Sequence, residues 1–167
     1  MTQCDEAIRR QLRKPVVYIM CGVPGSGKTH WAIRFRNMSI KKNNYPMVYI
    51  SSDNIREELC GNAQDQSFNK EVFELFYKRA REAVILYNDV ILDATHLTKK
   101  SRRKCRNHFK DLNCKFIAVQ LATPIGTAIR RNKNRSRVVP NYAMNRMINA
   151  FQPVEDDEGF EDIWVVN

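Results

Sequence analysis

Residues 22–29, which read GVPGSGKT, combine glycines, a lysine and a threonine in the spacing that binds nucleoside triphosphate. The glycines let backbone N–H groups approach phosphate oxygens, Lys28 supplies positive charge, and the Thr29 hydroxyl is suited to Mg²⁺. A chance glycine-rich turn is the alternative, but an apolar strand before the motif and a helix-like stretch at 31–37 favour a Walker A loop. The predicted nucleotide-binding residues are Gly22, Val23, Pro24, Gly25, Ser26, Gly27, Lys28, Thr29 and His30.

Two aspartates end apolar runs elsewhere in the chain, Asp53 after 47–50 and Asp93 at the end of 89–93. Because the carboxyl ends of parallel strands meet at one edge of a sheet, both are expected to face the γ-phosphate. We assign Asp53 as the general base that takes a proton from the attacking hydroxyl, with an N-cap of a helix at 54–59 as the alternative. Asp93 has the form of a Walker B aspartate that holds Mg²⁺ with Thr29, and a turn aspartate is its alternative.

Basic residues lie near these carboxylates in the sequence. Arg56, three residues after Asp53, is expected to clamp an acceptor phosphate, unless it is an exposed helix arginine. The cluster from Arg130 to Arg137 predicts a lid over residues 130–139 that closes on ATP, with a solvated loop as the alternative. Thr95 and His96 are candidates to line the acceptor pocket, although a structural role is the other interpretation of His96.

These residues need a scaffold in which strands alternate with helices. Strands are predicted at 16–21, 47–50, 89–93, 114–121 and 163–166, with helices between them. This order predicts an α/β P-loop NTPase fold, a three-layer α/β/α arrangement with a mostly parallel sheet of about five strands and an Arg-rich lid. Residues 1–167 are expected to form a single domain, with 1–14 as an N-terminal extension. Thr123-Pro124 predicts an N-cap and a first-turn proline for the helix that leads into the lid.

The chain carries 28 Lys and Arg against 18 Asp and Glu, a formal net charge of +10. This favours a polyanionic partner such as nucleic acid, although a basic surface also serves solubility. The predicted helix at 99–110 contains seven of the basic residues and is expected either to track a nucleic-acid backbone or to be a solvated face.

Five cysteines without a C-x-x-C pair indicate reduced thiols. The longest apolar run, 16–21, is far shorter than the roughly 20 residues of a membrane helix, and no signal peptide precedes it. The expectation is a cytoplasmic protein, in the host cytoplasm if phage-encoded, without a membrane partner. The sequence makes no prediction of the oligomeric state.

Four motifs occur in an order that resembles a known family: GVPGSGKT with Trp31, SSDNIR at 51–56, LDATHL at 92–97, and RNKNR at 131–135 before Val139-Pro140. From about residue 16 to 150 the chain is similar to the P-loop kinase domain of phage-type polynucleotide 5′-hydroxyl kinases. The resemblance implies that Lys28 and Thr29 bind ATP and Mg²⁺, and that Asp53 is the general base. It also implies that Arg56 contacts the acceptor phosphate and that Arg131 and Arg135 are catalytic lid residues on the donor phosphates. Asp93 lies in the family's acidic motif, and His96 replaces an asparagine common there.

The sequence therefore predicts an ATP-dependent kinase that transfers the γ-phosphate to the 5′-hydroxyl end of DNA or RNA, with ATP and Mg²⁺ as cofactors. GTP is disfavoured because 132–135 lacks the aspartate of an N-K-x-D motif. Two alternatives remain open. One is a kinase for a small molecule, a nucleoside or a hydroxymethylated DNA base, and the other is a nucleic-acid-binding ATPase module without a phosphoryl acceptor.

Overall fold

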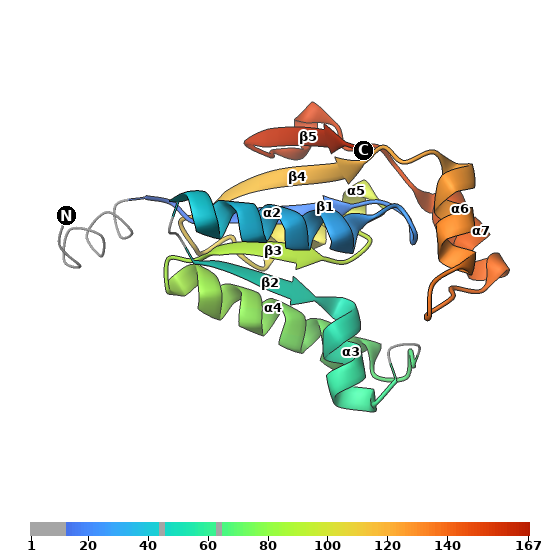
Figure 1. Ribbon diagram of the computed structural model, residues 1–167. Coiled ribbons are helices and arrows are strands. Elements are labelled where there is room, and N and C mark those ends of the chain that lie inside the picture. The colour runs from blue at the N-terminus through green and yellow to red at the C-terminus, as the bar shows by residue number, and fades with distance from the viewer. Residues whose placement is uncertain (1–12, 44–45, 63–64) are drawn as a thin grey trace.

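Five parallel strands form the centre of the computed structural model, which describes residues 13–43, 46–62 and 65–167 (Figure 1). The strands are β1 (Val16–Cys21), β2 (Met47–Ser51), β3 (Asp89–Asp93), β4 (Lys115–Leu121) and β5 (Asp162–Val166). Their order across the sheet is β2-β3-β1-β4-β5, and each neighbouring pair is parallel. The predicted α/β architecture is therefore confirmed. Most of the predicted extension at 1–14 lies outside the described residues.

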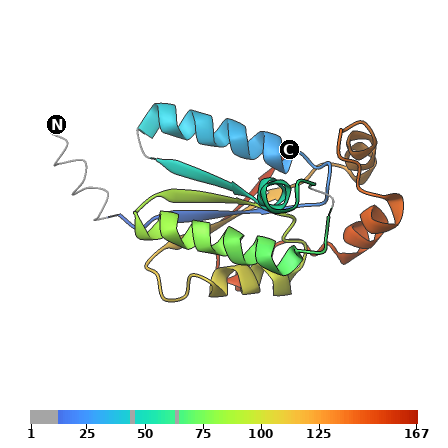
Figure 2. The same ribbon diagram turned by 90° about the horizontal axis from the view of Figure 1, so that it is seen from below.

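The alternation of side chains along the strands divides the core between the two faces of the sheet. In β1, Val17 and Ile19 pack against α4 (Asn69–Ile85) and α5 (Lys99–Asn107), whereas Tyr18 and Met20 pack against α2 (Lys28–Asn43). Figure 2 shows α2 on one side of the sheet and α4 and α5 on the other. The three layers expected from the sequence are present, and β1 and β3 are buried at their centre.

Aromatic side chains fix α2 against the sheet. Trp31 stacks on Phe35 at 4.8 Å between ring centroids, and Phe35 meets Trp164 of β5 edge-on at 5.6 Å. Tyr18 of β1 contacts both Phe35 and Trp164, at 5.0 and 5.5 Å. This cluster sets the position of the helix whose first residues follow the phosphate loop.

Three further helices gather at the carboxyl edge of the sheet, at the right of Figure 1. They are α3 (Ser52–Cys60), α6 (Ile125–Lys133) and α7 (Asn141–Ala150). A 3-10 turn, η1 (Asp156–Glu158), precedes β5. Because the loops after β1, β2 and β3 open at this edge, it brings together residues that are distant in the sequence.

Helix ends differ from the sequence prediction in three places. α2 begins at Lys28 and continues to Asn43, and α5 ends at Asn107 rather than at 110. Pro124 itself occupies the N-cap position of α6, so Thr123 is not the cap. The prediction was wrong there because the Thr123 hydroxyl donates to the Ser26 carbonyl of the phosphate loop instead of capping α6. Among the described residues, no helix is long and apolar enough to cross a membrane.

Candidate active site

The phosphate loop is held in place by segments on two sides. The N–H of Gly22 donates to the Thr95 carbonyl at 3.0 Å, which links the loop to the chain after β3. At Gly25, with φ of 78°, an added Cβ would lie 2.2 Å from the Ala128 carbonyl oxygen of α6. Gly27 has φ of 96°, which an L side chain rarely adopts. The loop therefore needs glycine both for its backbone shape and for the close approach of α6.

Thr123 completes this support. Its hydroxyl donates to the Ser26 carbonyl at 2.7 Å, across 97 residues of sequence.

At the other end of the loop, Trp31 is the first residue of α2 whose N–H bonds back to the loop, at 3.0 Å from Gly27 O. The N–H groups of Lys28, Thr29 and His30 precede it, and first-turn N–H groups of a helix have no helical partner. They are free to face an anion, which the helix dipole also favours.

Lys28 is buried beneath the loop, and its ammonium donates to the Val23 carbonyl at 2.8 Å. Burial lowers the pKa of Lys28 to about 8, and the nearby carboxylates of Asp93 and Asp53 oppose this fall. The Ser26 hydroxyl is also buried, and the structure gives it no hydrogen-bond partner. Both groups gain a partner if phosphate oxygens occupy the loop, so the cradle fits a nucleoside triphosphate.

Asp93 joins the phosphate loop to β2. Its Oδ2 accepts from the Thr29 hydroxyl and from the Tyr49 hydroxyl, each at 2.6 Å. Burial and the negative charge of Asp93 raise the pKa of Tyr49 well above its usual range, so Tyr49 stays a hydrogen-bond donor. Sequence reasoning missed Tyr49, because no motif marks a strand tyrosine two residues before the strand ends.

The paired oxygens of Thr29 and Asp93 suit Mg²⁺, which prefers oxygen ligands and keeps several waters or phosphate oxygens. The described part of the chain contains no group of three or more His, Cys, Asp or Glu that could hold a metal ion. The two oxygens of Thr29 and Asp93 would leave the other positions around such a metal to nucleotide and water.

Asp53 is the second residue of α3 and projects at the same edge as Asp93. The register pairs Ser51 with Asp93, so the chain reaches Asp53 two residues beyond this pair. The N-cap of α3 is Ser51, whose hydroxyl accepts from the Asn54 N–H, so the alternative role of Asp53 as the N-cap is wrong. The Asp53 side chain is 49% exposed and forms an ion pair with Arg137. A carboxylate is thus available at this edge and already faces an arginine.

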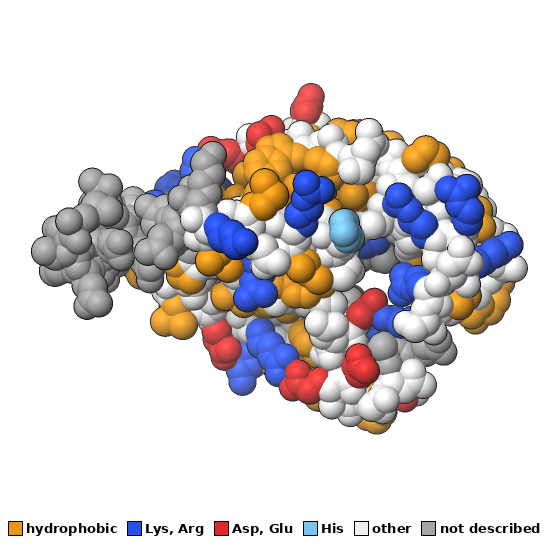
Figure 3. Space-filling view, in the orientation of Figure 1, with side chains coloured by type: hydrophobic (Ala, Val, Ile, Leu, Met, Phe, Trp, Pro, Cys, Tyr) orange, Lys and Arg blue, Asp and Glu red, His pale blue; other side chains and the backbone are white. Residues whose placement is uncertain are grey.

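Arg137 belongs to the arginine segment, as we call residues 130–139. Within it, Arg135 is half-buried, and burial followed by the charge of Arg137 lowers its pKa. Arg131 is exposed, with Nη1 3.6 Å from where a Cβ on Gly27 would lie. The segment therefore spans from the phosphate loop to Asp53. Lys and Arg side chains gather at this end of the molecule on the face shown in Figure 3.

Asn132 closes the arginine segment into a loop. Its side chain is buried, donates to the Val139 carbonyl at 2.8 Å and accepts from the Val139 N–H at 3.0 Å. Sequence reasoning missed Asn132, because an asparagine in a basic segment carries no signal until its partner is known. Sequence reasoning placed Arg131 and Arg135 at the site, but not Arg137.

Arg56 is buried rather than exposed, so the interpretation as a surface helix arginine is wrong. It donates from Nη1 to the Asp65 carbonyl at 3.0 Å and from Nη2 to Asn69 Oδ1 at 2.8 Å. Its Nε is buried and has no partner in the structure. Arg56 thus ties α3 to the start of α4, one helical turn beyond Asp53.

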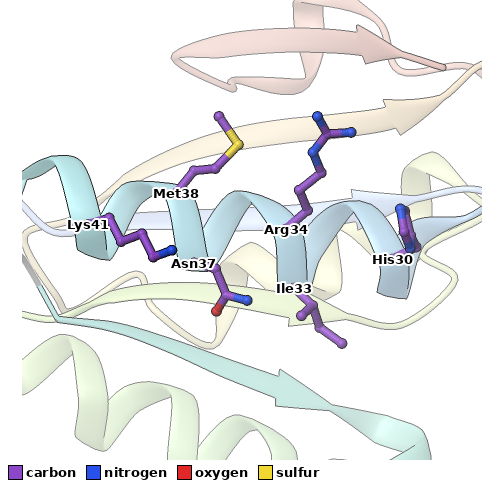
Figure 4. A pocket seen from close by; sticks show the side chains of 6 residues that line it. All are labelled: His30, Ile33, Arg34, Asn37, Met38 and Lys41. Carbon is purple, nitrogen blue, oxygen red and sulfur yellow. The ribbon is translucent and has the colours of Figure 1, made fainter.

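His96 and His30 lie in different surroundings. His96 is buried, with Nδ1 2.9 Å from the Met20 carbonyl oxygen, and burial lowers its pKa to about 4. The His30 side chain is on the outer face of α2, where it lines a pocket of about 350 Å³ with Arg34, Met38 and three neighbours (Figure 4). Only the backbone of His30, at the start of α2, is placed to face phosphate.

The predicted basic helix does not form a continuous cationic track. Arg102 is fully buried and forms a two-pronged ion pair with Glu158, with N–O distances of 2.5 and 2.7 Å. Lys99 pairs with Glu155 and Asp157 at 3.0 and 2.7 Å. The two interpretations of this helix, a nucleic-acid track or a solvated face, both omit this contact with the tail, as we call residues 155–167. Lys100, Arg103 and Lys104 remain exposed.

A family model described as an AAA domain, AAA_33, matches residues 17–154. Among curated proteins, the L-seryl-tRNA(Sec) kinase of Methanococcus maripaludis is 25% identical over 154 residues, which cover 89% of this chain and 56% of the relative. The chain thus spans just over half the length of this relative.

Solved structures share the fold at lower identity. Chaetomium thermophilum Kti12 in complex with ADP-AlF3 has a TM-score of 0.72 at 14% identity, with 90% of this chain and 88% of that one covered. A chain of the Pnkp1/Rnl/Hen1 RNA repair complex has a TM-score of 0.70 at 18% identity, over 83% of this chain and 44% of that one. The APS kinase CysC of Mycobacterium tuberculosis, in complex with AMPPNP and APS, has a TM-score of 0.64 at 19% identity, over 92% and 88%. The chain belongs to the AAA_33 family and has the P-loop kinase fold.

Proposed function

We propose that this chain is a kinase that transfers the γ-phosphate of ATP to the 5′-hydroxyl end of DNA or RNA. The observation that carries the proposal is Asp53, a half-exposed carboxylate at the sheet edge that bears Lys28, Thr29 and Asp93. A phosphate loop and a Mg²⁺-type aspartate serve any nucleotide hydrolase, whereas a further accessible carboxylate suits deprotonation of an acceptor hydroxyl.

In the proposed reaction, Asp53 takes the proton of the acceptor hydroxyl while the oxygen of that hydroxyl bonds to the γ-phosphorus. The bond from that phosphorus to the bridging oxygen breaks, and ADP leaves. Lys28 and the arginines at 131 and 135 offset the negative charge of the transferring group. Thr29 and Asp93 would hold a Mg²⁺ ion, which would add positive charge beside the phosphates. We propose that residues 130–139 act as the lid, and that ATP phosphates draw Arg137 away from Asp53 before the proton transfer.

The choice of a nucleic-acid acceptor rests on the net charge of the chain and on the names of similar proteins. The net charge of +10 favours a polyanion. One relative is named L-seryl-tRNA(Sec) kinase, and one fold neighbour belongs to an RNA repair complex. The APS kinase neighbour favours the second candidate, a small-molecule acceptor, because the fold match covers nearly the whole of both chains.

Transfer of labelled γ-phosphate from ATP and Mg²⁺ to short 5′-hydroxyl RNA and DNA strands tests the proposal. Labelled strands are expected with wild type and not with Lys28→Ala, and 5′-phosphorylated strands serve as blanks. Label only in small hydroxyl compounds would establish the second candidate. Inorganic phosphate as the sole product would identify an ATPase module.

The role of Asp53 is tested by Asp53→Asn, which keeps the shape but removes the base. Turnover is expected to fall by about 10²-fold or more, with ATP affinity retained. Glu57→Gln is the matched control, because Glu57 is an exposed carboxylate on the same helix. Turnover of Asp53→Asn within about threefold of wild type would refute the assignment.

A further inference from the structure

A pocket of about 760 Å³ lies between α4, α5 and the chain that follows β3. Phe73 and Tyr77 line it from α4, His96 from the chain after β3, and Lys104 and His108 from α5 and its C-cap. None of the steps proposed for phosphate transfer uses this volume. The residues around it combine planar apolar faces, one buried polar atom and exposed lysine.

His96 lines this pocket, and one of its ring nitrogens is buried without a hydrogen-bond partner. The Met20 carbonyl can only accept, so the Nδ1 that lies 2.9 Å from it carries the ring hydrogen. The ring is neutral near pH 7, and Nε2 therefore has a free lone pair. Nε2 is buried, and the structure gives it no partner. A buried acceptor without a donor is costly, and His96 in addition has a positive φ of 40°. A ligand that offers an N–H or O–H donor to this nitrogen removes the cost of the unpaired acceptor.

The remaining walls suit a flat ring. Tyr77 and His108 stack with centroids 3.8 Å apart and planes 12° apart, and Phe73 lies 6.2 Å from Tyr77. Stacking of a base on aromatic side chains is a common source of affinity for single strands. Lys104 is exposed, and no described contact neutralises it. The pocket thus pairs a site for a planar group with a cation for a neighbouring anion.

The pocket adjoins the proposed reaction centre through two connections. Asn69 lines the pocket and accepts from Arg56, which lies one turn beyond Asp53 on α3. The chain from 94 to 96, which also lines the pocket, begins directly after Asp93. A group in the pocket is therefore next to the edge at which an acceptor hydroxyl is expected to meet Asp53.

We propose that this pocket binds one unpaired nucleobase near the 5′ end of the acceptor strand. The base lies against Phe73 and Tyr77, one of its N–H groups donates to His96 Nε2, and a backbone phosphate lies near Lys104. Each of the four bases has an N–H group on its Watson–Crick edge, so the pocket selects unpaired bases rather than a sequence. The inference rests on the proposed function and adds to it that the substrate end is single-stranded.

Fluorescence of 2-aminopurine tests the binding step without ATP. The probe replaces the first, second or third base of 5′-hydroxyl DNA and RNA strands. Quenching by at least about twofold is expected at one of these positions with wild type, and much less with Phe73→Leu or Lys104→Gln. Phe68→Leu and Lys100→Gln are matched controls on the same two segments, outside the pocket lining. Lys104 is exposed, so Lys104→Gln keeps the test valid if Phe73→Leu fails to fold.

Kinetics with abasic strands provide the second readout. Loss of the base at the quenched position is expected to raise the KM of wild type roughly 5- to 150-fold, the range for one stacked base, with kcat little changed. In Phe73→Leu the same abasic substitution is expected to have a much smaller effect.

The failures of the two proposals are distinguishable. If strands are phosphorylated but no probe position is quenched and no abasic position changes KM, the base pocket is refuted and the kinase function stands. If no strand is phosphorylated, the function fails. The titration without ATP still reports on the pocket, and absence of quenching then refutes it as well.

Discussion

Lys28 is held in the phosphate loop by the Val23 carbonyl, a partner that we expect phosphate oxygens to replace when nucleotide binds. Its ammonium donates to the Val23 carbonyl, and burial lowers its pKa to about 8. Phosphate oxygens beside the ammonium favour the charged form and so raise this pKa in the complex. The difference between the two pKa values makes ATP affinity depend on pH.

We expect ATP affinity to be insensitive to the ionisation of Lys28 below about pH 8, where the ammonium is protonated in both states. Above about pH 8 the free protein loses the proton and must take one up on binding, so the Kd for ATP is expected to rise by up to about tenfold per pH unit. Calorimetry at pH 9 in buffers of different ionisation enthalpy measures this uptake. Lys28→Arg, which stays charged, is the control, and a flat wild-type profile up to pH 9.5 would contradict the argument.

The residues that sequence reasoning found and those that it missed differ in kind. Lys28, Thr29 and Asp93 stand in motifs whose chemistry fixes spacing along the chain, and the structure brings them together. Tyr49 was missed and Thr123 was given the wrong role, and each acts through one hydroxyl on a partner more than 40 residues away. Such contacts depend on strand register and helix packing, which no local pattern of residues encodes.

At the scale of elements, α6 and the arginine segment form a unit fastened to the phosphate loop. The backbone of α6 approaches Gly25 closely, and Asn132 at its end holds Val139 by two hydrogen bonds. The arginines at 135 and 137 lie between these fixed points. Asn132 therefore decides how firmly these cations are held over the site.

Asn132→Ala is expected to loosen the arginine segment without unfolding the sheet. The substitution leaves both backbone groups of Val139 without their partners, at roughly 1–3 kcal/mol for each group that stays buried. Trypsin cleavage at Arg135 and Arg137 is expected to become about fivefold faster or more, and the KM for ATP to rise. Asn134→Ala in the same loop is the control, since its side chain is exposed. Equal cleavage rates for the two variants would show that Asn132 does not hold the segment.

Elements were predicted well where a strand is buried on both sides. The ranges 16–21 and 89–93 agree with β1 and β3, because continuous apolar runs mark such strands. The ends of α2 and α5 were less accurate, since polar helices on a surface lack apolar periodicity at their ends. The cations at 99–106 were expected to face solvent or nucleic acid, but several face the tail, 50 or more residues away.

At the scale of the whole molecule, the pair of Arg102 and Glu158 links the sheet edge to the C-terminal segment. Arg102 also donates to the carbonyls of His96 and Gln152, at 3.2 and 2.9 Å. One buried guanidinium thus joins the chain after β3, the chain after α7 and the turn before β5. Because it is fully buried, its charge depends on the carboxylate of Glu158 for compensation.

Glu158→Gln is expected to destabilise the whole fold, because it leaves the Arg102 charge buried and uncompensated. Breaking a buried pair costs about 3–5 kcal/mol, which lowers Tm by roughly 6 to 20 °C for a chain of this size. Glu161→Gln is the matched control, since the pair of Glu161 with Lys115 is exposed and is expected to contribute at most about 1 kcal/mol. Thermal unfolding of the two variants at pH 7 measures the difference, and equal Tm values would refute the role of the buried pair.

Acid unfolding gives an independent check on the same pair. Burial alone would raise the pKa of Glu158, but the hydrogen bonds from Arg102 outweigh it and hold this pKa below its usual value. A carboxylate whose pKa is lower in the folded state stabilises the fold above its unfolded pKa of about 4.3, and this contribution is lost as pH falls through the folded value. Wild type should therefore lose stability more steeply than Glu158→Gln below about pH 4.3. Parallel curves of stability against pH for the two proteins in this range would show that the ionisation of Glu158 is not coupled to folding. That result would contradict the buried ion pair that joins the tail to the site.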